Sequence, residues 1–319
     1  MQTFISENIT ANASAQRKLV QLINAVMSQG ALNLNYEDNK TFTASETFAQ
    51  RAGNCLSFTN MFIALAREAG ISAYFQEVDI PPTWSKESGL ITLSRHLNVL
   101  IKTERSEEQV IDFNQPNFQG RFNQRKVTDD YAFAQYYSNI GVDHLHLGQH
   151  LKAFSHFKKA IQLDPTMPHS WTNLGALYST KGLYSHAEAA YLQTLRYAPK
   201  DEAALNNLNR LYDYLEKQEH AKYYRAQIVR FRENNPYYFH FLAQKSLEQD
   251  DLESAKRSIN KAIRIKKDDP AFYYTKSVIL EKSANRTDAA RNLKLAIRHA
   301  LPELKKRYQT KLLQLESTP

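Results

Sequence analysis

The chain has 319 residues, of which 42% are hydrophobic, and a formal net charge of +8 at pH 7. This length predicts about two domains, and the absence of a run of about 20 apolar residues excludes a transmembrane helix. The single cysteine excludes an internal disulfide and a multi-cysteine zinc site.

The charge is unevenly distributed along the chain. Residues 1–133 carry 12 basic and 14 acidic side chains, a net charge of −2, and residues 134–319 carry the remaining 29 and 19, a net charge of +10. The basic half favours acidic partners, although the same charge also keeps a helical array in solution. Without an arginine-rich run or an aromatic-basic motif, we expect no nucleic-acid partner.

The N-terminus has neither a basic segment nor an apolar segment of the secretory kind. We therefore expect a cytoplasmic protein by default. If a signal had been removed from the N-terminus, a periplasmic or envelope protein would show the same sequence.

Cys55 stands at the predicted start of a core helix. Apolar residues recur at helical spacing over residues 58–69, and Gly70 is the glycine expected after the helix end. Free N–H groups in the first turn of this helix would stabilise a thiolate and could bind an oxyanion. The alternative is a small buried side chain with a packing role only.

Three strands are predicted after this helix, at residues 71–80, 94–102 and 109–113, with a polar turn at residues 104–108. If the last two strands form a hairpin centred near residue 106, His96 and Asp112 are diagonal neighbours or are separated by a bulge. In either arrangement they lie within reach of each other on one face. The aspartate could then hold the imidazole that takes the thiol proton, although each residue alone also has an ordinary structural explanation.

The order of these residues resembles the transglutaminase-like superfamily of papain-type cysteine enzymes. It implies an α+β papain/transglutaminase-like N-terminal domain, with Cys55 as the nucleophile, His96 as general base and then acid, and Asp112 as the orienting carboxylate. The match is nearest to the bacterial branch that fuses this domain to tetratricopeptide (TPR) repeats. The resemblance covers roughly residues 35–120 and is carried by residues 51–58, 65–73, 95–99 and 110–112.

The sequence departs from the family at two places. After Asp112 the chain continues with Phe113-Asn114, where the family often has Pro-Thr. In the family a side chain upstream of the cysteine completes the oxyanion hole, and here Asn35, Tyr36 and Asn54 are the candidates.

From residue 134 onward the sequence repeats with a period of 34 residues, which is typical of a helix–turn–helix unit. One column of the repeat holds only alanine: Ala153, Ala187, Ala221, Ala255 and Ala289. A second holds mostly small residues: Gly141, Gly175, Asn209, Ala243 and Ser277. A third holds large apolar residues with one exception, Arg225: Phe157, Tyr191, Ile259 and Leu293.

This pattern resembles TPR proteins and predicts an all-α TPR solenoid. We expect a first domain at residues 1–133, five repeats at residues 134–302, and a C-terminal capping helix and tail at residues 303–319. The resemblance implies a concave groove that binds a protein or peptide, which the charge suggests is acidic. Groove candidates are Tyr178, Tyr212, Lys222 and Arg225, and helix packing explains the two tyrosines equally well.

No metal site or cofactor is expected. His144, His146 and His150 are spaced so that all three cannot lie on one helical face. The sequence has no phosphate-binding loop.

A Cys–His–Asp triad performs acyl transfer through a thioester. We therefore expect a thiol hydrolase of the peptidase or amidase type, acting on peptide or isopeptide amides, with the repeats recruiting the protein substrate. Two alternatives stay open. One is a catalytically inactive TPR scaffold, and the other is a protein-crosslinking transglutaminase.

Overall fold

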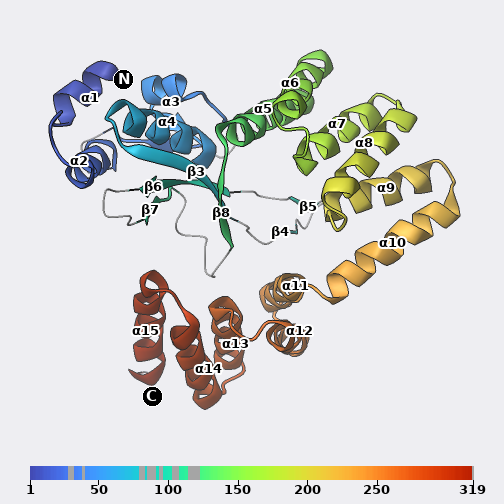
Figure 1. The fold of residues 1–319 in the computed structure, drawn as a ribbon. Helices are drawn as coiled ribbons and strands as arrows, with labels where there is room; N and C mark the ends of the chain where they lie inside the picture. The colour runs from blue at the N-terminus through green and yellow to red at the C-terminus, as the bar shows by residue number, and fades with distance from the viewer. Residues whose placement is uncertain are drawn as a thin grey trace. The chain divides into compact units, whose positions relative to one another are not determined.

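The computed structural model describes residues 1–27, 32–37, 40–78, 83–84, 91–92, 96–102, 108–113 and 123–317. Its helices and strands are labelled in chain order in Figure 1. The chain divides into two compact units, the first made of residues 1–80, 95–115 and 123–211, and the second of residues 81–94, 116–122 and 212–319. Several predicted features lie outside the described residues: the strand ends at 79–80 and 94–95, the turn at 104–107, and Asn114.

The first unit begins with three helices that pack against a fourth. The three are α1 (Gln2–Asn8), α2 (Ala15–Met27) and α3 (Ala44–Gln50), and the fourth is α4 (Cys55–Glu68). The start of α3 is fixed by a capping box, in which Thr43 and Glu46 each accept a hydrogen bond from the other's backbone N–H. Ten of the fourteen residues of α4 are buried. As the apolar pattern predicts, α4 is therefore the central element of the core.

A four-stranded antiparallel sheet in the order β7-β6-β3-β8 packs against α4. Its strands are β3 (Ser72–Val78), β6 (His96–Lys102), β7 (Glu108–Ile111) and β8 (Gln124–Val127). We did not predict β8 from the sequence. Three of its four residues are exposed at the sheet edge, so the strand lacks the apolar alternation that marks a half-buried strand.

Two further pairs of short strands complete the described strands. In the first unit, β1 (Asn35–Tyr36) runs parallel to β2 (Ala52–Gly53) just before α4. In the second unit, β4 (Thr83–Trp84) pairs antiparallel with β5 (Ile91–Thr92).

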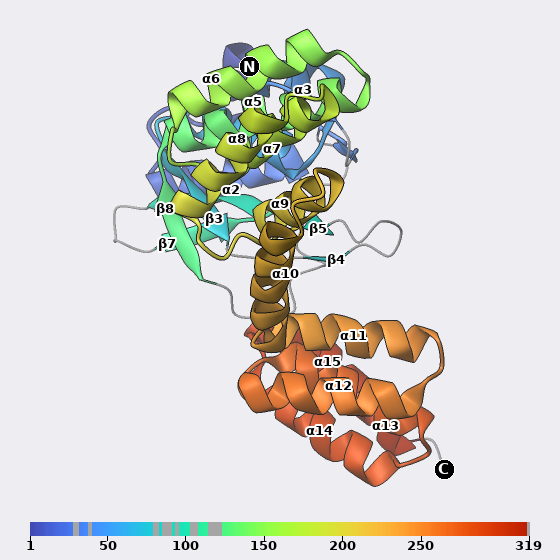
Figure 2. The ribbon, with the colours of Figure 1, turned by 90° about the vertical axis from the view of Figure 1, so that its right-hand side faces the viewer.

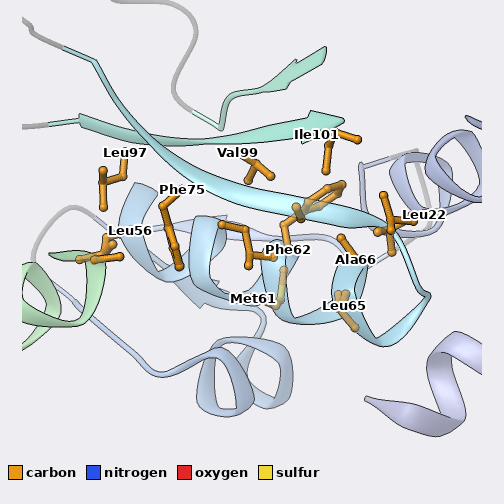
Figure 3. Packing of buried hydrophobic residues seen from close by; sticks show 14 of the residues in the cluster. Leu22, Leu56, Met61, Phe62, Leu65, Ala66, Phe75, Leu97, Val99 and Ile101 are labelled. Carbon is orange, nitrogen blue, oxygen red and sulfur yellow. The ribbon is translucent and has the colours of Figure 1, made fainter. Parts of the chain in front are cut away.

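The main core lies between α4 and the sheet, as Figure 3 shows. Alternate residues of β6 belong to this core, because side chains two positions apart lie on one face of a strand. The labelled side chains of β6 and α4 come from both layers: Leu97, Val99 and Ile101 from the strand, and Leu56, Met61, Phe62, Leu65 and Ala66 from the helix.

The rest of the described chain is helical. Four pairs of consecutive helices pack on each other: α5 (Asp129–His146) with α6 (His150–Leu163), α7 (Pro168–Thr180) with α8 (Tyr184–Tyr197), α11 (Pro236–Glu248) with α12 (Leu252–Ile265), and α13 (Pro270–Lys282) with α14 (Arg286–His299). Between the second and third of these pairs, the sequence forms α9 (Glu202–Tyr214) and α10 (Gln218–Glu233). The last helix is α15 (Pro302–Ser317). In the second unit, successive helices from α11 to α15 pack on one another (Figure 2).

Small residues in the second column of the repeat let the paired helices approach closely. A Cβ atom at Gly141 would lie 2.4 Å from Phe157, and one at Gly175 would lie 2.6 Å from Tyr191. Both distances are shorter than any ordinary carbon contact, so only glycine fits at these two positions. In these two repeats the large residue one helix later, Phe157 or Tyr191, fills the space.

The first repeat shares its core with the α/β region. Tyr131, Ala134 and Ala160 belong to the same buried cluster as α4 and the sheet. Arg67 of α4 adds a polar link, because its guanidinium forms two hydrogen bonds with the Asp129 carboxylate at 2.6 and 2.9 Å. The helix α5, which starts at residue 129, is therefore packed continuously with the α/β region.

None of the helices in the described part of the chain is both long enough and apolar enough to cross a membrane.

Candidate active site

Cys55 is the first residue of α4 and its side chain is partly exposed. The helix is capped by Asn54, whose Oδ1 accepts a hydrogen bond from the Ser57 N–H at 3.0 Å. This cap uses the third N–H of the helix and leaves the N–H groups of Cys55 and Leu56 without an intrahelical acceptor. Two backbone donors and the positive end of the helix dipole therefore lie next to the sulfur.

Gly53 brings the chain tightly into this first turn. Its φ is +149°, and a Cβ atom there would lie 2.6 Å from Cβ of Ser57. A larger residue would push the preceding strand away from the helix. The glycine two residues before Cys55 is therefore required by the geometry of the turn that presents the thiol.

His96 and Asp112 meet across the β6–β7 hairpin. Nε2 of His96 lies 2.8 Å from both carboxylate oxygens of Asp112. The ladder pairs Val99 with Ile111, and continuing this register places residue 98 opposite Asp112 and His96 one diagonal step away. Of the two arrangements open from the sequence, the structure has the diagonal one.

The histidine is held as a cation beside the thiol. The side chain of His96 is 3% exposed, and burial alone would lower its pKa. Hydrogen bonds and charge interactions with Asp112 and with Cys55 outweigh burial and raise the pKa of His96 to about 9. Since Nε2 faces the carboxylate, Nδ1 is the ring nitrogen left for the sulfur. The structure thus brings Cys55, His96 and Asp112 together.

Asn98 is a site residue that our sequence reasoning missed. Its Nδ2 lies 3.3 Å from Oδ2 of Asp112, and the whole side chain is 2% exposed. It lies two positions after His96 and so on the same face of β6. That alternation was visible in the sequence, but only the register shows that Asn98, not His96, stands directly opposite the aspartate.

The three candidates for the oxyanion hole have different positions. Tyr36 pairs with Gly53 in the short parallel ladder, so it lies beside the strand that leads to Cys55. Asn35, its neighbour, is exposed, and its Nδ2 lies 3.4 Å from Oε1 of Glu37. The amide of Asn54 is engaged at both ends, since it caps α4 and donates to Thr41 at 2.8 Å. The side chain of Asn54 therefore shapes the turn before α4.

The two tyrosines proposed for the groove differ in how deeply they are buried. Tyr212 is 3% exposed and stacks on Tyr224 with ring centroids 5.6 Å apart. A residue that contacts a partner needs an exposed surface, so Tyr212 does not serve the groove as expected. Tyr178 is half-buried and lies 5.3 Å from the ring of His186.

The two cations proposed for the groove are exposed but already paired. Lys222 contacts Glu219 of the same helix at 3.0 Å, and its side chain is 65% exposed. Arg225 contacts Asp213 of α9 at 3.0 Å. Exposed ion pairs contribute little free energy, so both cations could exchange these carboxylates for those of a ligand.

The three histidines of the first repeat do not gather into one site. Nδ1 of His144 lies 2.8 Å from Gln149, and its ring stacks on His156 with centroids 5.1 Å apart. Over the part of the chain that the structure describes, no three His, Cys, Asp or Glu side chains are grouped as metal ligands.

Sequence models of known families match both regions. Residues 3–84 match the transglutaminase-like superfamily, and residues 134–167 and 168–201 each match a tetratricopeptide repeat. The chain has a transglutaminase-like core domain followed by TPR repeats. The match to the transglutaminase-like domain contains Cys55 but ends before His96 and Asp112. The assignment of His96 and Asp112 to the candidate site therefore rests on the hydrogen bonds and the strand register described above.

Among solved structures, the chain is similar to several TPR proteins. YrrB, described as a TPR protein with an unusual peptide-binding site, is 19% identical over 56% of this chain and 92% of that chain, with a TM-score of 0.30. The pilF protein of Pseudomonas aeruginosa is 20% identical over 59% and 93%, with a TM-score of 0.32. A thermophilic TPR protein of Thermus thermophilus is 18% identical over 56% and 99%, with a TM-score of 0.29. No curated protein sequence matches the chain.

Proposed function

We propose that this protein is a thiol-dependent acyl-transfer enzyme of the hydrolase type. The observation that supports this most strongly is the arrangement around His96. This buried imidazole contacts both oxygens of Asp112 at 2.8 Å and is hydrogen-bonded to Cys55. A nucleophile next to a base that is oriented by a third group is the constellation that forms covalent acyl intermediates.

The proposed reaction begins with the Cys55 thiolate and the protonated His96. The sulfur attacks the amide carbonyl, and the N–H groups of Cys55 and Leu56, with the hydroxyl of Tyr36, stabilise the oxyanion. His96 gives its proton to the leaving amine, which departs and leaves a thioester on Cys55. His96 then takes a proton from water, the hydroxide attacks the thioester, and the carboxylic acid leaves with the thiolate restored.

Water is the proposed acceptor. Cys55 is partly exposed at the start of its helix, so solvent can reach a thioester formed there. We propose peptide or isopeptide amides as the substrates, because amides are the acyl donors of this superfamily in the resemblance drawn from the sequence.

The TPR repeats are proposed to recruit the protein substrate or partner. TPR repeats are protein-interaction modules, and residues 134–319 carry a net charge of +10. Lys222 and Arg225 are exposed cations of the third repeat. These features favour an acidic protein or peptide as the ligand.

An activated ester tests this function without knowledge of the natural substrate. Wild-type protein is expected to hydrolyse p-nitrophenyl acetate with a burst of p-nitrophenolate as Cys55 is acetylated, followed by steady turnover. Cys55→Ala should abolish both phases, whereas Ser155→Ala, at an exposed position of α6, should retain them. An unchanged rate in Cys55→Ala, or no turnover by the wild type, would refute the proposed hydrolase.

A further inference from the structure

A cavity lies on another face of the helix that begins at Cys55. Its volume is about 410 Å³, and residues from α3, α4, β3, α5 and α6 line it, all within the first unit. This size is within the range of about 300–1,000 Å³ that is usual for small-molecule sites. Its walls are mainly apolar: Ala44, Ile63, Ala64, Phe75, Phe133 and Leu163.

This cavity is separate from the thiol site. Asn60, Ala64 and Arg67 line it from α4, and their spacing of four and then three residues places them on one face of the helix. Cys55 precedes Asn60 by five residues, which at about 100° per residue places it roughly 140° away around the helix axis. Cys55, His96 and Asp112 are not among the lining residues.

Asn60 lines the cavity and has an unpartnered carboxamide oxygen. Its side chain is 8% exposed, and its Oδ1 is buried without a hydrogen-bond partner among the described residues. Leaving such a group unpaired costs about 1–3 kcal/mol. A bound group with an N–H, such as a secondary amide, could donate a hydrogen bond to this oxygen.

Lys159 supplies an available positive charge at the same cavity. It is exposed, and no carboxylate within the described residues forms an ion pair with it. Its helix, α6, contains three lysines and no acidic residue. Arg67, the other cation of the lining, is already occupied by Asp129 at 2.6 Å. An anionic ligand group would therefore be bound by Lys159.

Two tyrosines complete the polar part of the lining. Burial raises the pKa of Tyr136, and the nearby Glu46 and Tyr137 raise it further, so its hydroxyl stays protonated and can donate a hydrogen bond. The carboxylate of Glu46 lies near Tyr136, and it accepts hydrogen bonds from the backbone N–H and the hydroxyl of Thr43.

We propose that this cavity binds the C-terminal hydrophobic residue of a peptide. The apolar walls hold the side chain, Lys159 binds the terminal carboxylate, and the carboxamide of Asn60 pairs with the last peptide amide. The lining therefore matches a ligand that has an apolar body, one negative charge and one secondary amide. The site would give the protein a peptide-recognition function that does not depend on Cys55 chemistry.

Isothermal titration calorimetry with N-acetyl-L-phenylalanine tests the site on the full chain. This probe carries the aromatic side chain, the amide and the carboxylate, and saturable binding of one molecule per chain is expected. N-acetyl-L-phenylalaninamide, which lacks the carboxylate, should bind at least about tenfold more weakly, because a charge-assisted hydrogen bond is lost. N-acetylglycine, which lacks the apolar body, should show no measurable binding. Equal binding of all three compounds, or of none, would overturn the proposal.

Matched variants locate the binding. Lys159→Gln should weaken N-acetyl-L-phenylalanine about tenfold, whereas Lys158→Gln, the same charge change one residue earlier and outside the lining, should leave it unchanged. Ala64→Leu should block the cavity and abolish binding. Cys55→Ser should bind normally, which separates this inference from the proposed catalytic function. Binding that survives Ala64→Leu, or that falls equally in both lysine variants, would contradict the assignment.

Discussion

The α/β region and the TPR repeats differ in how their sequences determine their packing. In the repeats, one packing rule recurs every 34 residues, so five alanines of one column are all fully buried. In the α/β region, each contact of the thiol site occurs once. We therefore expect the loss of one repeat contact to change stability and the loss of one site contact to change the proposed activity.

The largest effect is expected from Asp112→Asn. The amide would remove the negative charge that stabilises the imidazolium of His96 and would favour the wrong tautomer. Turnover of p-nitrophenyl acetate should fall by about 10³–10⁴-fold. Asp268→Asn, at a carboxylate whose side chain is 72% exposed, serves as the control and should retain full activity. Equal activity of the two variants would remove Asp112 from the catalytic site.

The two regions also differ in how much could be predicted from the sequence. The repeat helices follow from the spacing, because the alanine column, the column of mostly small residues and the column of mostly large apolar residues each have one packing role. The α4 helix and the His96 strand followed from their apolar patterns. The edge strand β8 did not, because three of its four residues are exposed and carry no apolar signal.

Within the site, the order of Cys55, His96 and Asp112 suggested the proposed acyl-transfer chemistry. Two other features of the site could be seen only in the structure. The position of Asn98 opposite Asp112 depends on the hairpin register, which a difference of a single residue in the turn would change. The parallel pairing of Tyr36 with Gly53 involves a two-residue strand, which is too short to show a pattern. Long-range register of this kind has no local sequence signal.

In contrast to Asp112→Asn, Gly141→Leu should change the stability of the protein. The new side chain would overlap Phe157, whose ring lies 2.4 Å from the position that a Cβ atom would take, and overpacking of this kind costs about 1–3 kcal/mol. Chemical denaturation should show the loss in the free energy of unfolding. Gly148→Ala is the control: its neighbourhood is open, and its φ of +70° should cost only about 1 kcal/mol.

A smaller effect is expected from Arg67→Gln. This change removes the paired hydrogen bonds to Asp129 that link α4 to the first repeat. Because both side chains are more than a third exposed, the free energy of unfolding should fall by about 1 kcal/mol or less. A loss as large as that of Gly141→Leu would mean that the polar link, rather than the shared apolar core, joins the two regions.

The most direct test of the thiol site is the pH dependence of Cys55 alkylation by iodoacetamide, because the chain has no other cysteine. The raised pKa of His96, about 9, means that its imidazolium is favoured in the folded protein and is lost as the pH rises through that value. Below about pH 9 this cation should favour attack by the sulfur of Cys55, so alkylation of the wild type should be faster than that of His96→Gln over this range. In His96→Gln the rate should rise only near the ordinary cysteine value of about 8.5. Coincident pH profiles for the wild type and His96→Gln would contradict the central claim that His96 activates Cys55.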